Sequence, residues 1–334
     1  MKRSIYCILL MIFLLTNICS CDMVSGRNSS NSSNVPIHIN RFDKDLYQLI
    51  ILDTPEWQEQ IATNYPEMLK AIGLGIFRMP DTQHPGFFDQ LVNYYSEPTL
   101  NKLYQDALRV FETIETLEAS LSTGFHYLKI NFPTMQIPAV YMHISGLHQN
   151  VLVDDSLLSI SIDKYMGSEY PLYKDYFRDY QLRKMNPDRI VPDYLKAWLL
   201  SEYPFTGNDR ILLERMIYEG KIIYIIHQAL QKALPEILMG YSSSEYQWCK
   251  QNEKILWKTI IERQHLFTPD AATTTRYFSE MPSIFISDDA PGNLGVWIGW
   301  QIVAKYMNRT KSTVEELMNN TDYQEILTQS RYKP

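Results

Sequence analysis

Two carboxylates, Glu219 and Asp193, are the residues of this sequence with the clearest potential for chemistry. Glu219 lies in an apolar run over residues 212–226 with helical spacing, so its side chain is expected to face a largely apolar surface. A buried carboxylate must be paired, or its pKa must rise. Two interpretations stay open for Glu219: an ion pair with Arg215 one helical turn earlier, or an acid–base or metal-binding position. Gly220 directly after it is unfavourable in a helix interior and indicates a close backbone approach.

Asp193 belongs to the preceding helix, which the sequence predicts within the run Asn186–Phe205. Proline residues favour helix starts in this run, and Trp198 is expected to face the core. Asp193 and Glu219 can then approach each other from consecutive helices, although two carboxylates do not by themselves define a site. Both are kept as candidate catalytic residues, and no residue is assigned to cofactor binding.

Familiar catalytic and metal-binding motifs are missing from the sequence. It contains no H-E-x-x-H, no G-x-S-x-G, no P-loop and no Cys/His cluster with zinc spacing. The seven histidines are scattered, and the closest pair, His143 and His148, is expected to make surface or hydrogen-bonding contacts rather than to bind a ligand. Cys249 beside Trp248 is expected to be a small apolar core residue. The sequence therefore predicts no metal and no cofactor.

Cys21 closes an N-terminal segment that is typical of a bacterial lipoprotein signal. Lys2 and Arg3 precede an apolar run over Ile5–Leu15, which is too short to span a membrane. Ser20 supplies a small residue directly before the cysteine. Cleavage there leaves the Cys21 thiol free for lipid attachment; the alternative is an ordinary secretory signal with an incidental cysteine.

With cleavage before Cys21, the chain is predicted to consist of three segments. Residues 1–20 form the signal peptide, residues 21–36 the lipidated cysteine and a flexible tether rich in Ser and Asn, and residues 37–334 a single globular domain. Loss of the two positive charges of Lys2 and Arg3 moves the formal net charge from −7 to −9. An acidic exported chain is a poor candidate for nucleic-acid binding, so no nucleic-acid partner is expected. Cys249 is the one cysteine left besides Cys21, so no intrachain disulfide is expected.

The predicted fold is α+β and mostly helical, with a small antiparallel sheet or hairpin packed on helices. Alternating apolar residues predict a hairpin of Val151–Val153 and Leu157–Ile162, after a β-like segment at Ala139–Ser145. Helix caps are expected at Thr54 before Pro55, at Ser243 or Ser244, and at Ser312 with Glu315 in a capping box. The longer helical patterns cover residues 98–128, 170–185, 187–200, 208–234, 243–257 and 291–307.

Several segments of the folded part resemble the gliding motility lipoprotein family GldB of Bacteroidetes. The resemblance extends from end to end and implies an envelope lipoprotein that is required for gliding and linked to the associated secretion machinery. The matching segments are NRFDKDLY (Asn40–Tyr47), SIDKYMG (Ser161–Gly167), IVPDYLKAW (Ile190–Trp198), ERMIYEGKIIY (Glu214–Tyr224), WCKQNEKILW (Trp248–Trp257), APGNLGVWIGWQIVAKYM (Ala290–Met307) and SRYKP (Ser330–Pro334).

A more distant likeness concerns the fold. Glu219-Gly220, followed by a G-x-x-I-G-x-x-I-V-x-x-Y pattern over Gly295–Tyr306, is similar to a family of predicted gluzincin-type metallopeptidases. In that family an earlier helix carries H-E-x-x-H, and the next helix supplies a Glu ligand followed by Gly. Here the earlier helix reads DYLKAW (Asp193–Trp198), whereas such a zinc site needs two imidazoles one helical turn apart. The likeness implies a zincin-like fold that lacks the zinc motif, without zinc and without peptidase activity.

These observations favour a non-enzymatic envelope lipoprotein that acts as an assembly or interaction component of a gliding or secretion-type machinery. Its expected partners are the membrane, through the lipid, and envelope proteins. Two alternatives stay open: a hydrolase with a non-zinc carboxylate mechanism that uses Glu219 with Asp193 or a nearby histidine, and a surface nutrient-binding lipoprotein with a large aromatic cleft. Surface-exported lipoproteins of this group carry an acidic cluster after the cysteine, but only Asp22 follows Cys21 here. The expected location is therefore the outer membrane, with the domain facing the periplasm.

Overall fold

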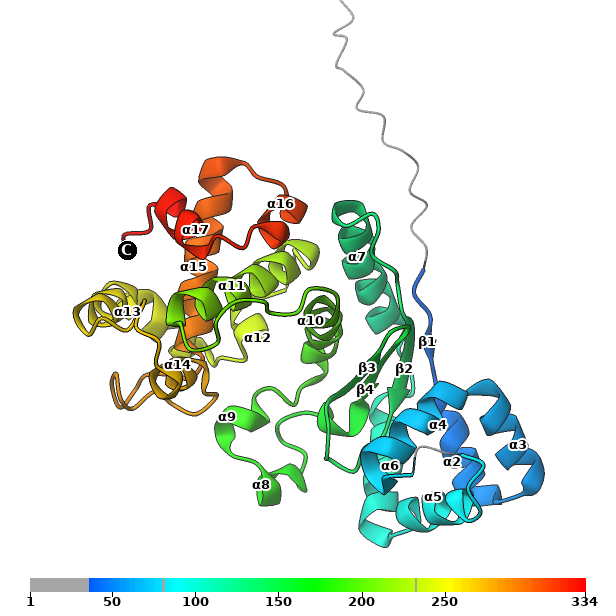
Figure 1. Cartoon of the computed structure of the whole chain (residues 1–334). Helices are drawn as coiled ribbons and strands as arrows, with labels where there is room; N and C mark the ends of the chain where they lie inside the picture. The colour runs from blue at the N-terminus through cyan, green and yellow to red at the C-terminus, as the bar shows by residue number, and fades with distance from the viewer. Residues whose placement is uncertain (1–35, 80–81, 232) are drawn as a thin grey trace, which may run out of the picture. The chain divides into compact units, whose positions relative to one another are not determined.

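The computed structural model describes residues 36–79, 82–231 and 233–334. They belong to one compact unit, shown in Figure 1. The predicted signal peptide, Cys21 and the tether through residue 35 lie outside the described residues. None of the helices in the described ranges combines the length and the apolar character needed to span a membrane.

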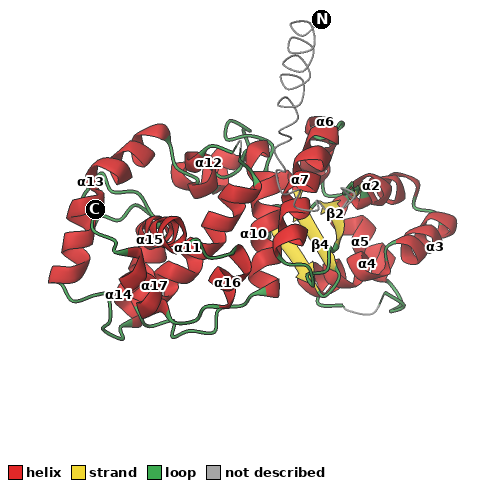
Figure 2. Cartoon of the chain, turned by 90° about the horizontal axis from the view of Figure 1, so that it is seen from above, coloured by secondary structure: helices red, strands yellow, loops and turns green. Residues whose placement is uncertain are grey.

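A four-stranded mixed sheet lies in the middle of the fold (Figures 1 and 2). β3 and β4 form the predicted antiparallel hairpin, with Val151 opposite Ile160. β1 and β4 both run parallel to β2, so the predicted antiparallel sheet is corrected to a mixed one. Parallel neighbouring strands are joined by long crossover connections. Ile39 of β1 lies opposite Val140 of β2, about a hundred residues later, and no local pattern in the sequence indicates such a pairing. The strands are β1 (Ile39–Asn40), β2 (Ala139–His143), β3 (Val151–Asp154) and β4 (Leu157–Ser161), in the order β1-β2-β4-β3.

The first half of the unit is built from helices around β1 and β2. The Thr54 side chain accepts a hydrogen bond from the backbone N–H of Trp57, which confirms the predicted cap before Pro55. The periodic run over 98–128 is divided into two helices, because the chain turns between Phe111 and Ile114 and buries both side chains. The helices are α2 (Phe42–Leu52), α3 (Pro55–Asn64), α4 (Pro66–Ile72), α5 (Phe87–Tyr95), α6 (Pro98–Val110) and α7 (Glu115–Asn131).

The second half is almost entirely helical and confirms the mostly helical α+β class. The expected helix over 170–185 is instead two short helices, because an extended Phe177 and Arg178 separate them. Two caps also differ from the prediction by one position: Ser242 pairs with Glu245, and Thr313 pairs with Glu316. The helices are α8 (Tyr173–Tyr176), α9 (Asp179–Leu182), α10 (Ile190–Glu202), α11 (Leu212–Ala229), α12 (Pro235–Met239), α13 (Ser243–Glu262), α14 (Ala271–Phe278), α15 (Leu294–Thr310), α16 (Val314–Asn319) and α17 (Tyr323–Ser330).

Helices α11 and α15 cross with their backbones in contact at the centre of this half (Figure 1). A Cβ added to Gly220 would lie 2.2 Å from the carbonyl carbon of Gly299, which confirms the predicted close approach. A Cβ added to Gly299 would lie 1.7 Å from the carbonyl oxygen of Met216. The crossing fixes α11 in place, and α11 carries Glu219. On the neighbouring α10, Trp198 faces the core as predicted, with 1% of its surface exposed.

Lys221, which like Glu219 lies on α11, is a buried cation. Only 2% of its surface is exposed, and its Nζ donates to the backbone carbonyl of Asn320 at 2.6 Å. Burial disfavours the charged ammonium and lowers the pKa of Lys221 to about 8, from 10.5 for a solvated lysine.

Lys221 is therefore expected to make the protein more stable as the pH rises above 8. Because the folded pKa lies below the unfolded one, the unfolded chain binds more protons between pH 8 and 10.5, and the free energy of unfolding rises over that range. From pH 8 to 9.5 Lys221 is expected to raise the free energy of unfolding by about 1.5 kcal/mol. Urea unfolding should show this rise in the wild type and in the control Lys258→Met, whose lysine is exposed on α13. An equal rise in Lys221→Met would contradict this assignment.

Candidate functional site

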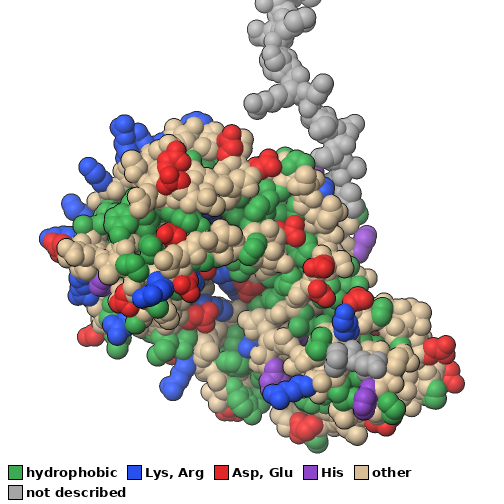
Figure 3. All heavy atoms as spheres, in the orientation of Figure 1, with side chains coloured by type: hydrophobic (Ala, Val, Ile, Leu, Met, Phe, Trp, Pro, Cys, Tyr) green, Lys and Arg blue, Asp and Glu red, His purple; other side chains and the backbone are tan. Residues whose placement is uncertain are grey.

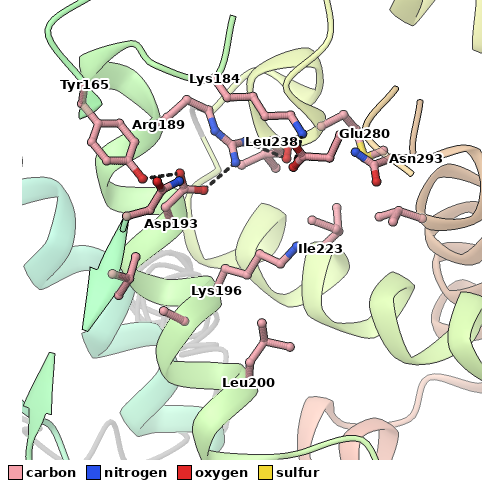
Figure 4. A pocket seen from close by; sticks show the side chains of 15 residues that line it. Tyr165, Lys184, Arg189, Asp193, Lys196, Leu200, Ile223, Leu238, Glu280 and Asn293 are labelled. Carbon is pink, nitrogen blue, oxygen red and sulfur yellow. Dashed lines mark hydrogen bonds and ion pairs between the residues drawn. The ribbon is translucent and has the colours of Figure 1, made fainter. Parts of the chain in front are cut away.

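A cavity of about 260 Å³ lies between α10, α11 and the start of α15 (Figure 4). One face of α10 forms a wall, because residues at i, i+3, i+4 and i+7 lie on the same side of a helix. In the orientation of Figure 1, the space-filling view shows a hollow near the centre of the face, with acidic and basic side chains around it (Figure 3). The side chains of the α10 wall are Asp193, Lys196, Ala197 and Leu200.

Asp193 is held on the polar side of this cavity by two donors. Arg189, one turn earlier, donates from Nη2 to Oδ1 at 2.5 Å, and the Tyr165 hydroxyl donates to Oδ2 at 2.9 Å. Arg189 also donates from Nη1 to the backbone carbonyls of Ile237 and Leu238. Burial raises the pKa of Tyr165 well above its usual value, so its hydroxyl keeps the donated proton. Both oxygens of Asp193 are thus occupied, which suits a positioning role better than proton transfer.

Lys184 and Glu280 close the cavity at its far end (Figure 4). Their Nζ and Oε1 atoms lie 2.7 Å apart. Burial lowers the pKa of Lys184, and the carboxylate of Glu280 opposes that shift. Gly240 leaves room for the lysine stem: it has a φ of 68°, and a Cβ there would lie 2.8 Å from the Lys184 Cγ.

Glu219 forms ion pairs with two cations. Its Oε1 is 3.8 Å from Nη2 of Arg215, which confirms the predicted ion pair, and its Oε2 is 3.6 Å from Nζ of Lys196. Glu219 does not belong to the cavity lining, and the structure places it and Asp193 in separate ion pairs. Lys196 therefore connects Glu219 to the cavity, since its side chain runs from α10 into that space (Figure 4).

Glu219→Gln is expected to lower the free energy of unfolding by about 2 kcal/mol, between the values for surface and buried ion pairs. The neutral amide leaves Lys196 and Arg215 without a carboxylate, while the Glu219 side chain is only 15% exposed. Chemical unfolding measures the loss. The matched control is Glu262→Gln, whose side chain is 64% exposed in a pair with Lys258 and which should change stability little. A fully stable Glu219→Gln protein would contradict the structural interpretation of this residue.

Comparison with known families gives a match over nearly the whole chain. A family model described as gliding motility protein GldB matches residues 25–334. The chain belongs to this family. Comparisons with curated proteins and with solved structures give no match. The resemblance seen in the sequence is thereby confirmed at the level of the family.

The cavity of this GldB protein is not suited to zinc. Where a zincin-like helix would present two imidazoles one turn apart, α10 presents an ammonium at Lys196 and an isobutyl group at Leu200. An ammonium beside Glu219 repels a metal cation and already provides the countercharge that this carboxylate needs. Among the described residues, no three His, Cys, Asp or Glu side chains are grouped so that they could hold a metal.

The other residues considered from the sequence lie away from this cavity. His143 is buried in β2, where its Nδ1 lies 2.8 Å from Oγ of Ser159, and His148 is exposed. Cys249 is a buried free thiol, as predicted, and burial raises its pKa to about 12. None of the three lines the cavity.

Four charged residues of the cavity lining were not identified from the sequence. Arg189 could have been found, because it precedes Asp193 by four positions in a predicted helix. Lys184, Lys196 and Glu280 carry no local signal, because their partners lie on other elements.

Larger hollows also lie elsewhere on the described surface. An apolar groove of about 850 Å³ runs between α7 and the end of α11, with Ile130 and Leu234 exposed along it. A second hollow of about 1080 Å³ lies beside α8 and α9 and presents Tyr176, Phe177 and Tyr180.

Proposed function

We propose that this GldB protein is a non-catalytic component of a gliding or secretion-type machinery and that its cavity is an interaction site. The observation that carries the proposal is the ion pairing around the cavity. Asp193 is hydrogen-bonded to Arg189 and Tyr165, and Glu280 to Lys184, while Glu219 lies 3.6 Å from Lys196 and 3.8 Å from Arg215. A general base must be free to accept a proton from a substrate, and these carboxylates are instead neutralised by neighbouring cations.

A lipid on Cys21 is proposed to hold the protein at the outer membrane, with the domain facing the periplasm. The support is the basic, apolar and small-residue pattern of the first 21 residues and the weakly acidic stretch after Cys21. Metabolic labelling with a palmitate analogue tests the anchor, because labelling should disappear in Cys21→Ala. Protease treatment of intact cells tests the side, and rapid digestion of the domain would contradict a periplasmic location.

The non-catalytic role is tested by replacing the carboxylates in the source organism. Glu219→Gln and Asp193→Asn should keep gliding or secretion in proportion to the amount of folded protein, measured by immunoblot. Crosslinking and pulldown of the tagged full chain should recover envelope proteins. A variant present at the wild-type level with no residual function would instead support the alternative, a hydrolase that uses these two carboxylates. Stoichiometric zinc in the purified protein would also overturn the non-catalytic proposal.

A second candidate function is nutrient binding. The hollow beside α8 and α9 favours it, because Tyr176 is 67% exposed there and aromatic faces are suited to stacking on ligands. Calorimetric titration with a soluble oligosaccharide such as maltohexaose should then release heat that Tyr176→Ala removes. Titrations without heat would count against this candidate.

A further inference from the structure

The first turn of α15 borders the cavity. Asn293 and Val296 line the cavity at this point, and Asn293 is the N-cap residue, with a φ of 55°. Its side chain makes no capping hydrogen bond. The first backbone N–H groups of a helix have no partner within the helix, and they carry a partial positive charge. This end of the 17-residue helix is therefore attractive to an anion.

Lys196 supplies an ammonium that is available to a ligand. Its nearest carboxylate, on Glu219, is 3.6 Å away, beyond hydrogen-bond distance. Within the described part of the chain no hydrogen bond from its Nζ is found, and its side chain is 35% exposed. Lys184 and Arg189 differ, because both already donate to carboxylates. Lys196 is thus the cation of the described cavity that donates no hydrogen bond, although the buried Nε of Arg189 also has no partner.

The charged groups at the cavity carry a formal net charge of +1. Three cations and two carboxylates line the cavity, and the pair of Glu219 with Arg215 beside Lys196 adds one charge of each sign, although the whole chain carries a formal net charge of −7. Apolar side chains line the cavity together with these charged groups (Figure 4), so a fitting ligand combines a negative group with an apolar side chain. The lining cations are Lys184, Arg189 and Lys196, the lining carboxylates Asp193 and Glu280, and the lining apolar side chains include Leu200, Ile223, Leu238, Met239 and Val296.

The size and the position of the cavity favour the end of a peptide over a free small molecule. At about 260 Å³ the cavity is smaller than typical small-molecule sites of about 300–1,000 Å³. It opens beside Asn150 and Val151, where β3 begins. β3 is the last strand in the sheet order, so only one of its edges is paired with a strand. Such an edge can hydrogen-bond to an extended peptide backbone.

We propose that the cavity binds the C-terminal residue of an extended peptide. The terminal carboxylate binds Lys196 and the first turn of α15, and the apolar side chain packs between Leu200 and Ile223. The preceding residues extend along β3. This inference rests on the proposed function, in which the cavity is an interaction site, and it names the chemistry of the partner.

The test is a titration of the full chain, purified in detergent, with two matched peptides. The probes are N-acetyl-Gly-Gly-Gly-Gly-Leu with a free carboxylate and the same peptide with a C-terminal amide. NMR or calorimetric titration should show that the carboxylate binds about tenfold more tightly or better, because a charge-assisted hydrogen bond is lost in the amide. N-acetyl-leucine should bind more weakly than the peptide. Equal binding of carboxylate and amide would overturn the carboxylate site, and equal binding of N-acetyl-leucine would overturn the peptide assignment.

Three variants assign the effect to Lys196. Lys196→Met should abolish the preference for the carboxylate, and Lys196→Arg should keep most of it, since both retain a long side chain and only one keeps the charge. Lys174→Met, at an exposed lysine outside the cavity, should bind like the wild type. A Lys196→Met protein with a wild-type circular dichroism spectrum and an unchanged preference would contradict the proposal.

The outcome separates this inference from the proposed function. If the peptides fail to bind while Cys21 is lipidated and the full chain still recovers envelope proteins, only the carboxylate site is rejected. If the peptide with a free carboxylate binds, but Glu219→Gln or Asp193→Asn loses gliding or secretion at the wild-type protein level, the non-catalytic role is rejected instead.

Discussion

Gly299→Ala is expected to lower the free energy of unfolding by about 3 kcal/mol or more, at the upper end of the cost of overpacking a core. The new methyl group would lie 1.7 Å from the carbonyl oxygen of Met216, a distance that no side-chain rotation can relieve because both atoms are fixed by helix backbone. α11 and α15 must then separate at their crossing. Chemical unfolding monitored by circular dichroism measures the effect, and Gly220→Ala should behave in the same way for the same reason.

The matched control is Gly124→Ala, in the middle of α7. There a Cβ would lie 2.6 Å from Cδ1 of Leu195, the end of a side chain that can rotate away. Alanine also has a better helix propensity than glycine by about 1 kcal/mol, which offsets part of the strain. A loss as large for Gly124→Ala as for Gly299→Ala would contradict the assignment of the cost to the backbone crossing.

Acid is expected to destabilise this protein through His143. Only 1% of its surface is exposed, and burial lowers its pKa to about 3, from 6.5 in a solvated chain. Between these values the unfolded chain binds a proton that the folded protein does not, so the free energy of unfolding falls as the pH falls. The contribution between pH 7 and pH 4.5 is about 2.5 kcal/mol. Urea unfolding at the two pH values measures it.

His143→Asn should remove this part of the pH dependence, because the amide can still hydrogen-bond to Ser159 but does not titrate. The variant is expected to be less stable at every pH, since the smaller side chain leaves a cavity, so the difference between the two pH values is the informative quantity. Burial raises the pKa of the nearby Asp163, which acts in the opposite direction and is common to all variants. His148→Asn, at an exposed position, is the control. A His143→Asn protein with the wild-type pH dependence would show that another group is responsible.

The two candidate carboxylates show which ion pairs helical spacing alone can predict. The pair of Glu219 with Arg215 followed directly from positions four apart in one helix, and the structure confirms it. The same rule applied to Arg189 and Asp193 would have found their ion pair. The interaction of Lys196 with Glu219 joins two helices, and Tyr165 reaches Asp193 from outside α10. These contacts depend on how the elements pack, which a single sequence does not report.

The division is similar for the fold. Apolar periodicity predicted the helices and the hairpin of β3 and β4, because both are set by neighbours in the sequence. The parallel pairing of β1 with β2, and the break at Phe111–Ile114 in the run 98–128, follow from contacts with distant residues. The caps at Ser242 and Thr313 each lie one residue from the nearest predicted position, since neighbouring Ser and Thr are chemically equivalent there.

The sequence by itself determined the family, the mostly helical α+β class, the ion pair of Glu219 with Arg215 and the close approach at Gly220. Each depends on residue types at fixed local spacing or on similarity over the whole chain. Only the tertiary structure decided that Asp193 and Glu219 have separate cationic partners and that Lys196 lies between Glu219 and a cavity at the start of α15. The physical reason is that a helix fixes the positions of its own residues, whereas the meeting of α10, α11 and α15 is set by core packing, including the contact of Gly220 with Gly299.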